Sequence, residues 1–240
     1  MPTLSRSMTI CFLIFAVLGF TATSRAQTKP PIAEQIAKAY GLDSFGQIDA
    51  IRYTFSLPAL KVLRTWTWEP KADRVTYEGK DKEGKPVKVT YVRSQLDSQP
   101  ENVKKEIDPG FINDQYWLLF PFHMVWDTGA AVEDKGMEAV PTGKGKARHI
   151  VVKYGSEGYT PGDTWEFYVG PDNRILYQVF HHGGNAKPSL VKMTWEGYKQ
   201  AGPLLISTLH KGTADGHPAE ITFSNVAVKT AGSDNWVEAK

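Results

Sequence analysis

Alternation of apolar and polar residues is the clearest signal along the chain, and its strongest example lies in the middle. Residues 164–169 and 175–180 each alternate between two faces, and Trp165 and Phe167 share one face of the first run. A period of two residues is the spacing of a pleated β-strand. The sequence Gly-Pro-Asp-Asn at 170–173 supplies a turn, because proline presets φ and both Asp and Asn tolerate left-handed backbone angles. We therefore predict a hairpin that is covered on both faces or curved, since both faces carry bulky apolar side chains.

The same alternation recurs in short runs through most of the chain. Strands are expected at residues 49–58, 61–69, 74–78, 86–93, 148–154, 164–169, 175–180, 189–198, 204–211 and 220–229. Short strands at close spacing are typical of an antiparallel meander. No helix is expected between successive strands, so parallel βαβ units are not indicated. The pattern predicts a single α+β domain built on a strongly curved antiparallel sheet of about ten strands.

Two further segments depart from the strand pattern. Residues 31–40 place Ile32 and Ile36 on one helical face, and Gly41 provides a stop. A helix here is expected to cap the end of the sheet or to lie across the mouth of its curve. The polar residues 127–147, rich in Gly and Lys, are expected to form a loop.

Residues 111–126 are rich in large apolar and aromatic side chains. Asn113 or Asp114 is suited to cap a brief helix that runs to Phe120 and ends at Pro121, because proline lacks the N–H group that a helix needs. Two interpretations are open: a core segment, which the usual burial of such residues favours, or the wall of an apolar cavity. The sheet is thus expected to have one or two covering helices.

The start of the chain has the features of a secretory signal peptide. A basic beginning precedes an apolar core from Met8 to Phe20, and small residues fit a cleavage site after Ala26. The apolar core is too short to span a membrane, which takes about 20 apolar residues. We therefore expect a signal peptide at 1–26 and a single β-rich domain at 27–240. The expected location is the bacterial periplasm, with extracellular export as the second choice.

Removal of the signal changes both the charge and the cysteine content. Arg6 and Arg25 leave with it, so 26 basic and 26 acidic residues remain. A neutral chain argues against nucleic-acid binding and against purely electrostatic binding to membranes. Cys11, the only cysteine, lies in the signal. The mature chain therefore has no disulfide, no cysteine nucleophile and no cysteine metal ligand.

Candidate catalytic and metal-binding residues form no known motif in this sequence. The chain has six histidines but no H-x-H or H-E-x-x-H spacing, so we expect neither a metal ion nor another cofactor. The nucleophile motif G-x-S-x-G is also absent. Glu166 and Glu196 lie on aromatic-rich strands and are candidates for a paired-carboxylate hydrolase, although acidic residues on strands usually face water. No catalytic residue is predicted, and an envelope hydrolase using these carboxylates or the histidines is an alternative.

Aromatic residues make up 12% of the chain, and most lie on expected strands or in residues 111–126. The concave side of a curved sheet must be filled or must bind something apolar. Trp and Tyr suit such a lining, because each combines an apolar ring with one polar atom. The alternative is that these rings fill the space under a covering helix. The candidate ligand-binding residues are Tyr53, Phe55, Trp66, Trp68, Tyr77, Trp117, Phe120, Phe122, Trp126, Trp165, Phe167 and Tyr177.

In the order of these elements the chain resembles the LolA/LolB-like periplasmic lipoprotein-carrier superfamily. The resemblance rests on the cleaved signal, the helix at 31–40, the strand at 51–57, the meander at 62–93, the sequence Tyr-Trp-Leu-Leu-Phe-Pro at 116–121 and the hairpin at 165–177. It implies a half-open β-barrel closed by helices, with an acyl chain or another apolar ligand in the concave face.

The resulting prediction is an exported, non-enzymatic carrier or binding protein for an apolar ligand. The expected partner is an apolar small molecule, a lipid or a lipidated protein, with a transient contact to the membrane or to an envelope protein. We expect a monomer that binds no nucleic acid. A scaffold protein with a filled core is the second alternative, beside the hydrolase.

Overall fold

The computed structural model describes residues 29–81, 83–143, 145–156, 159–183 and 189–240. The signal peptide expected at 1–26 lies outside these residues. The helical segments are α1 (Pro31–Ala39), α2 (Leu42–Phe45), η1 (Pro58–Leu60), η2 (Pro70–Ala72), η3 (Arg93–Ser98), η4 (Val103–Ile107) and α3 (Asp108–Trp126). The strands are β1 (Ile48–Leu57), β2 (Val62–Glu69), β3 (Arg74–Lys80), β4 (Pro86–Val92), β5 (Ala130–Ala139), β6 (Lys146–Tyr154), β7 (Thr164–Val169), β8 (Ile175–His182), β9 (Ser189–Thr194), β10 (Glu196–Ala201), β11 (Leu204–Ala214), β12 (His217–Thr230) and β13 (Val237–Glu238).

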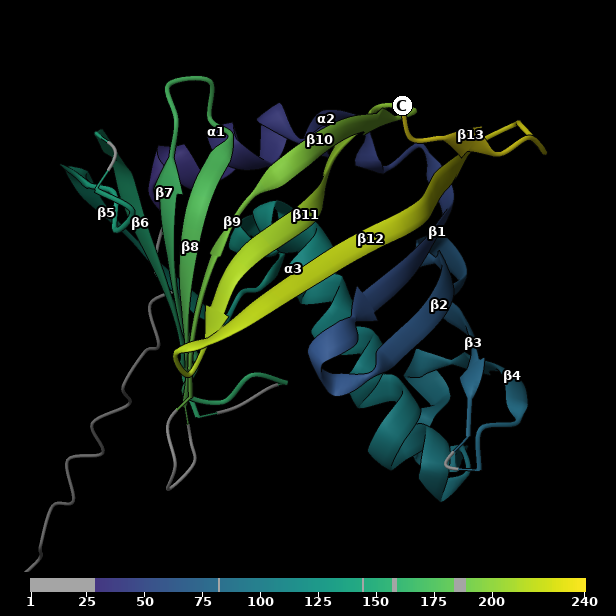
Figure 1. The fold of residues 1–240 in the computed structure, drawn as a ribbon. Helices are drawn as coiled ribbons and strands as arrows, with labels where there is room; N and C mark the ends of the chain where they lie inside the picture. The colour runs from purple at the N-terminus through teal and green to yellow at the C-terminus, as the bar shows by residue number, and fades with distance from the viewer. Residues whose placement is uncertain (1–28, 82, 144, 157–158, 184–188) are drawn as a thin grey trace, which may run out of the picture.

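All thirteen strands in the described part of the chain belong to one antiparallel sheet (Figure 1). Their order is β4-β3-β2-β1-β12-β11-β9-β8-β7-β6-β5, with β10 paired to β11 and β13 paired to β12. β4 and β5 lie at opposite edges, so the sheet is open and is not closed into a barrel. The α+β class and the large antiparallel sheet expected from the sequence are confirmed, with more strands than the expected ten or so.

α3 crosses one face of the sheet, which we call the inner face, and passes behind β11 and β12 in Figure 1. Its Phe111 ring lies 5.5 Å from that of Trp66 on β2, measured between centroids. At the far side, Phe120 lies 4.5 Å from Phe167 on β7. Most residues of α3 are buried, as expected for a helix that is apolar all round. The helix therefore fills the middle of the inner face as part of the core.

The end of α3 differs from the sequence prediction. A stop at Phe120 is expected, but the helix continues through Pro121 to Trp126. Pro121 cannot donate to the carbonyl of Trp117, and Leu119 leaves the helical region with φ of −116° and ψ of 18°. The expectation is wrong because the buried second half of the helix is stabilised by tertiary packing, which outweighs the local cost of proline. The result is a kinked helix.

The expected cap at Asn113 or Asp114 is also wrong, because α3 begins earlier, at Asp108. Asp114 lies in mid-helix and is fully buried. Its carboxylate accepts hydrogen bonds from Arg64 Nε and Nη2 at 2.8 and 2.6 Å, and from Trp66 Nε1 at 2.8 Å. A buried carboxylate needs such partners, because removal from water is costly. These bonds fix α3 to β2.

The region expected to be a loop, residues 127–147, contains the edge strand β5. It pairs with β6 along its whole length, with a bulge between Asp134 and Gly136, where Gly136 has φ of 80°. The loop prediction is wrong because an edge strand with one solvent-exposed side carries charged residues in place of clear alternation. β5 closes the end of the sheet opposite β4.

α1 confirms the helix expected at residues 31–40. Pro31 occupies its first turn, where the missing N–H group costs nothing, and Ile32 and Ile36 are buried. Gly41 follows with φ of 104°, and a Cβ atom there would lie 2.4 Å from the carbonyl oxygen of Pro203. Only glycine suits this turn, which sets the path from α1 to the sheet.

Candidate functional site

The structure does not bring the twelve candidate ligand-binding residues together around one cavity. Six of them are at most 1% exposed and belong to the inner-face core: Tyr53, Phe55, Trp66, Phe120, Phe122 and Phe167. They are covered because α3 occupies the middle of the inner face. The other six lie in different places. Trp117 and Trp165 line one cleft, while Tyr77 and Trp126 each line a different, smaller hollow. Trp68 is half-buried at the rim of the core, and Tyr177 lies on the opposite face of the sheet.

A cleft of about 650 Å³ lies between the first half of α3 and the strands β7 and β8. We call it the α3–β8 cleft. Its volume is within the usual range for sites that hold small molecules. The cleft is lined by Pro109, Ile112, Asn113, Tyr116 and Trp117 of α3, by Tyr159, Thr160, Pro161 and Asp163 after β6, and by Trp165, Phe180, His182 and Ser189 of the strands.

Three packed aromatic rings form one wall of the α3–β8 cleft. Trp165 lies 5.1 Å from Trp117 and 4.3 Å from Phe180, measured between ring centroids. Trp165 is also packed on its inner side against Phe120, at 4.6 Å. Edge-to-face and tilted rings at these distances stabilise one another beyond the area that they bury. The wall is therefore preformed by the core, and a ligand would contact Trp117 and Phe180 without moving them.

The polar groups of the cleft are concentrated around Asp163. This residue is only 4% exposed, and its carboxylate accepts hydrogen bonds from His182 Nδ1 at 3.0 Å and from the Gly183 backbone N–H at 2.8 Å. These contacts hold the segment after β6 against the end of β8. Neither lysine nor arginine is among the residues described as lining this cleft. The cleft therefore offers a ligand apolar rings, a few polar groups and one carboxylate that is already hydrogen-bonded within the protein.

Sequence reasoning identified two residues of this wall and missed others. Trp117 and Trp165 were candidates, whereas Phe180, Ile112 and Tyr116 were not. Phe180 faces Trp165 directly across the hairpin. The hairpin turn, combined with the two-residue period, contained the signal for that pairing, because cross-strand neighbours share a face. Ile112 and Tyr116 depend on the orientation of α3, which the chain pattern does not reveal.

A smaller hollow of about 310 Å³ adjoins the cleft and shares Tyr116, Tyr159 and Thr160 with it. Asp127, just after α3, borders this hollow and accepts hydrogen bonds of 2.7 Å from both Tyr116 and Tyr154. His123 Nδ1 lies 3.0 Å from the same carboxylate. Burial raises the pKa of Asp127, but the hydrogen bonds and the charge of His123 outweigh this and hold the pKa below its usual value. This network fixes the C-terminal end of α3 to β6.

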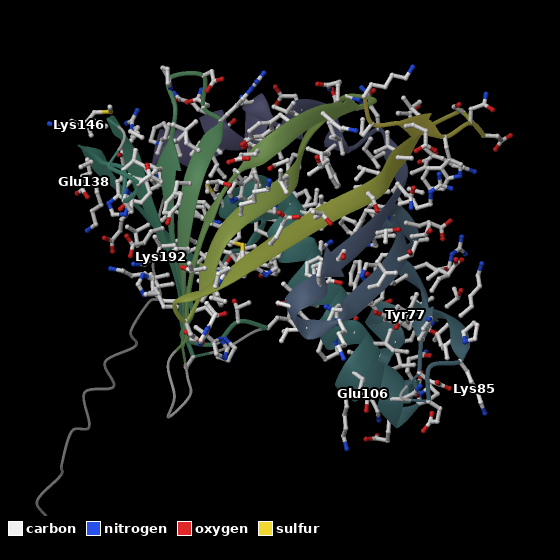
Figure 2. All side chains as sticks on the ribbon, in the orientation of Figure 1. Tyr77, Lys85, Glu106, Glu138, Lys146 and Lys192 are labelled. Atoms are coloured by element: carbon white, nitrogen blue, oxygen red, sulfur yellow. The ribbon has the colours of Figure 1, made fainter. Side chains whose placement is uncertain are left out.

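A third hollow, of about 430 Å³, lies on the other side of α3 near β2 and β3. Figure 2 shows two of its lining residues, Tyr77 and Glu106, far from the labelled Glu138 at the β5 edge. Arg64 also lines it and is held by the buried Asp114. Burial raises the pKa of Asp114 to about 6, although the charge of Arg64 and its hydrogen bonds favour ionisation. This hollow is mixed in charge and is more polar than the α3–β8 cleft.

Glu166 and Glu196, the carboxylates proposed for a hydrolase, line none of these three spaces. Glu166 lies on the outer face, where its two oxygens accept from His149 Nε2 at 2.9 Å and from His181 Nε2 at 2.6 Å. The other ring nitrogen of His149 lies 2.9 Å from Glu138. These contacts place Glu166 in a network of carboxylates and imidazoles on the outer face of the sheet. Glu196 is exposed on β10.

Neither a cluster of metal-binding side chains nor a helix able to cross a membrane is present in the described part of the structure. Within it, no group of three or more His, Cys, Asp or Glu residues is arranged to hold a metal ion. The helices of the same residues include none that combines the length and the apolar character needed to cross a membrane.

Comparison with known proteins gave little similarity. No family model matches the chain, and no curated protein matches its sequence. Among solved structures, the chain is similar to the crystal structure of a DUF1329 family protein from Desulfovibrio piger, with a TM-score of 0.46 and 11% sequence identity. The match covers 86% of this chain and 96% of that chain. This similarity is too low to assign a family.

Proposed function

We propose that this protein binds an apolar ligand in the α3–β8 cleft and acts as a non-enzymatic carrier or sensor. The observation that supports this is a cleft of about 650 Å³ that is bordered by three aromatic rings and lies beside the helix that fills the middle of the inner face. Large apolar rings normally lie inside a protein, and a concave apolar pocket with a few polar groups is the usual form of a binding site. The binding site proposed is thus the margin of the inner face, beside α3.

The proposed ligand is a lipid or the lipid group of a lipidated protein. The resemblance of the element order to the lipoprotein-carrier superfamily supports this choice, as does the proposed export of the chain. We propose the periplasm as its location, on the basis of the signal features in residues 1–26. Fractionation of cells that express the full chain tests the location: a processed form is expected in the periplasmic fraction.

The ligand proposal is tested first by native mass spectrometry on protein purified from an envelope fraction. We expect a mass increment that disappears on extraction with organic solvent and that corresponds to a lipid in the extract. The delipidated protein should then take up a fluorescent fatty-acid analogue. Recovery of ligand-free protein, together with no uptake of the probe, would support a scaffold with a filled core and contradict the proposal.

Phe180→Ala locates binding in the cleft. Phe180 is half-buried, so its removal should leave the fold intact while deleting part of the aromatic wall. We expect the Kd of the fluorescent probe to rise about tenfold, the effect of losing one good aromatic contact. The matched control is Leu176→Ala, because Leu176 lies on the same strand, is 45% exposed and does not line the cleft. An equal effect of both substitutions would place the ligand elsewhere.

A further inference from the structure

We propose that two copies of this chain associate through the free edge of β4, which pairs antiparallel with β4 of the second copy so that Val89 lies opposite Val89. β4 is the end strand of the sheet order and lies at the margin of the sheet in Figure 1. This surface is separate from the α3–β8 cleft, so the inference does not depend on the proposed ligand. It differs from the monomer expected from the sequence.

Two hydrogen bonds show which backbone groups of β4 point away from the sheet. Arg93 N–H donates to the Asp73 carbonyl at 2.8 Å, and Asp81 N–H donates to the Lys85 carbonyl at 3.0 Å. Both bonds follow the register in which β3 and β4 pair without interruption. Hydrogen-bonded pairs alternate along an antiparallel ladder. The odd-numbered residues of β4 therefore bond to β3, and the backbone groups of the even-numbered residues point outward.

The outward backbone groups of β4 form a free edge. They belong to Pro86, Lys88, Thr90 and Val92. Among the described residues, none donates to or accepts from these outward groups. A row of unpaired N–H and C=O groups is a template on which another strand can pair. The strand is also held in place, because the Tyr91 hydroxyl donates to the buried carboxylate of Asp108 at 2.9 Å.

The side chains on the inner face of β4 leave apolar surface for a second strand to cover. Val87 and Val89 pack against the core but are only half-buried, as befits the last strand of an open sheet. In the proposed pairing Val89 lies opposite its own copy, and Val87 lies opposite Tyr91. Cross-strand pairs of β-branched and aromatic side chains stabilise a sheet. Each copy thus supplies the apolar partner that the other lacks.

Proline and lysine often protect an edge strand, but neither opposes this pairing. Pro86 is the first residue of β4 and lies opposite Val92, whose N–H group would donate to the Pro86 carbonyl, so only one bond at the strand end is missing. Lys88 lies opposite Thr90, so like charges are not directly opposed. The Lys88 ammonium also stays 2.6 Å from Glu78 on its own sheet.

This complementarity favours a second copy over an extended segment of another protein. The apolar pairs, the placement of Lys88 and the use of all three outward N–H groups follow from the β4 sequence alone. A two-fold pair uses the β4 edge of both copies, so association by this contact stops at a dimer.

Sedimentation equilibrium of the wild-type protein and of Thr90→Pro tests the proposal. We expect the wild type to dimerise with a Kd in the micromolar range, because the shared strand is short. Thr90→Pro removes an outward N–H group and no bond to β3, so the Kd should rise at least tenfold with an unchanged circular dichroism spectrum. The matched control is Thr76→Ala, because both substitutions delete the 2.8 Å contact between the two hydroxyls. It should dimerise like the wild type.

Val89→Cys provides a test that does not require the proline variant to fold. Residues opposite each other in a non-hydrogen-bonded pair have Cα atoms about 4.5 Å apart, which a disulfide can span. The only native cysteine, Cys11, lies in the signal expected to be removed. Mild oxidation should therefore give a covalent dimer of Val89→Cys. Lys135→Cys, on the β5 edge, is the control and should remain uncrosslinked.

Three results would overturn the proposal. The first is a wild type that stays monomeric at every concentration measured, and the second is a dimer that Thr90→Pro leaves intact. The third is a dimeric Val89→Cys protein that forms no disulfide. Binding of an extended peptide to a monomeric wild type, lost in Thr90→Pro, would assign the edge to another protein and would also contradict pairing of two copies.

Discussion

The two sides of α3 are attached to the sheet in different ways. Toward β2, Asp114 receives three hydrogen bonds of 2.6 to 2.8 Å from Arg64 and Trp66. Toward β7, Trp117 and Trp165 meet through their rings, with 5.1 Å between centroids, and the cleft of about 650 Å³ lies beside them. Hydrogen bonds to a buried carboxylate therefore attach α3 to β2, whereas packing of aromatic rings attaches it to β7.

This difference explains why the apolar opening lies where it does. The hydrogen bonds between the Arg64 guanidinium and the Asp114 carboxylate require one geometry, and the hollow beside them is lined by charged as well as apolar residues. Ring contacts tolerate several arrangements, so apolar surface can remain uncovered there. A ligand-binding cleft on the β7 side therefore leaves the hydrogen bonds that attach α3 to β2 intact.

Arg64→Ala should have the largest effect, because it leaves the buried carboxylate of Asp114 without its cation. We expect the free energy of unfolding to fall by about 3–5 kcal/mol, measured by urea denaturation with tryptophan fluorescence. The control is Lys88→Ala, whose exposed ion pair with Glu78 should be worth less than about 0.5 kcal/mol. Similar losses for both variants would show that the β2 side is not held by charge.

Tyr154→Phe measures how much the hydrogen bond at the C-terminal end of α3 adds to the ring contacts on the β7 side. The Tyr154 hydroxyl donates to Asp127 behind the adjoining hollow, and its loss should cost about 2 kcal/mol, the usual worth of a hydrogen bond to a charged group. Tyr177→Phe on the outer face is the control and should stay within about 0.5 kcal/mol of the wild type. A loss from Tyr154→Phe as large as that from Arg64→Ala would remove the contrast between the two sides.

The smallest effect is a dependence on pH that has opposite signs at the two carboxylates. The pKa of Asp114 is raised in the folded state to about 6 from 3.8. The resulting contribution to the free energy of unfolding is therefore fully present below pH 3.8 and is lost as pH rises through 6. The pKa of Asp127 is lowered, so its contribution is present above pH 3.8 and is lost in stronger acid. Between pH 7 and pH 5 the wild type should therefore gain about 1 kcal/mol relative to Asp114→Asn.

Urea denaturation of both proteins at pH 7, 6 and 5 measures this difference. If the two stability curves run parallel over this range, Asp114 does not titrate there and the sign argument fails.

Much of the sheet could be predicted from alternation, because most strands have one buried face. The strand β5 was not predicted, because its edge position allows charged residues such as Glu133 and Lys135 where a central strand needs apolar residues. The length of α3 was predicted wrongly for a different reason. Pro121 is a local stop signal, and only the burial of the following turn, which depends on the whole fold, outweighs it.

The candidate site was harder to predict, because the same types of aromatic residue line a cleft and fill the core. Phe167 and Trp165 share one face of one strand, and both are deeply buried. Whether such a ring also borders an opening depends on how far α3 extends over it. That position is set by long-range contacts such as the bond from Arg64 to Asp114, which the spacing of aromatic residues does not contain.

The bulge at Gly136 in β5 has a consequence for the behaviour of the protein in concentrated solution. An open sheet leaves the backbone of its last strand available for addition of a neighbouring molecule, strand on strand. Two features make the β5 edge unfavourable for pairing with a further strand. They are the local kink at Asp134 and Gly136 and the opposite charges of Glu133 and Lys135. The β5 edge is therefore poorly suited to pairing with a strand of a neighbouring molecule.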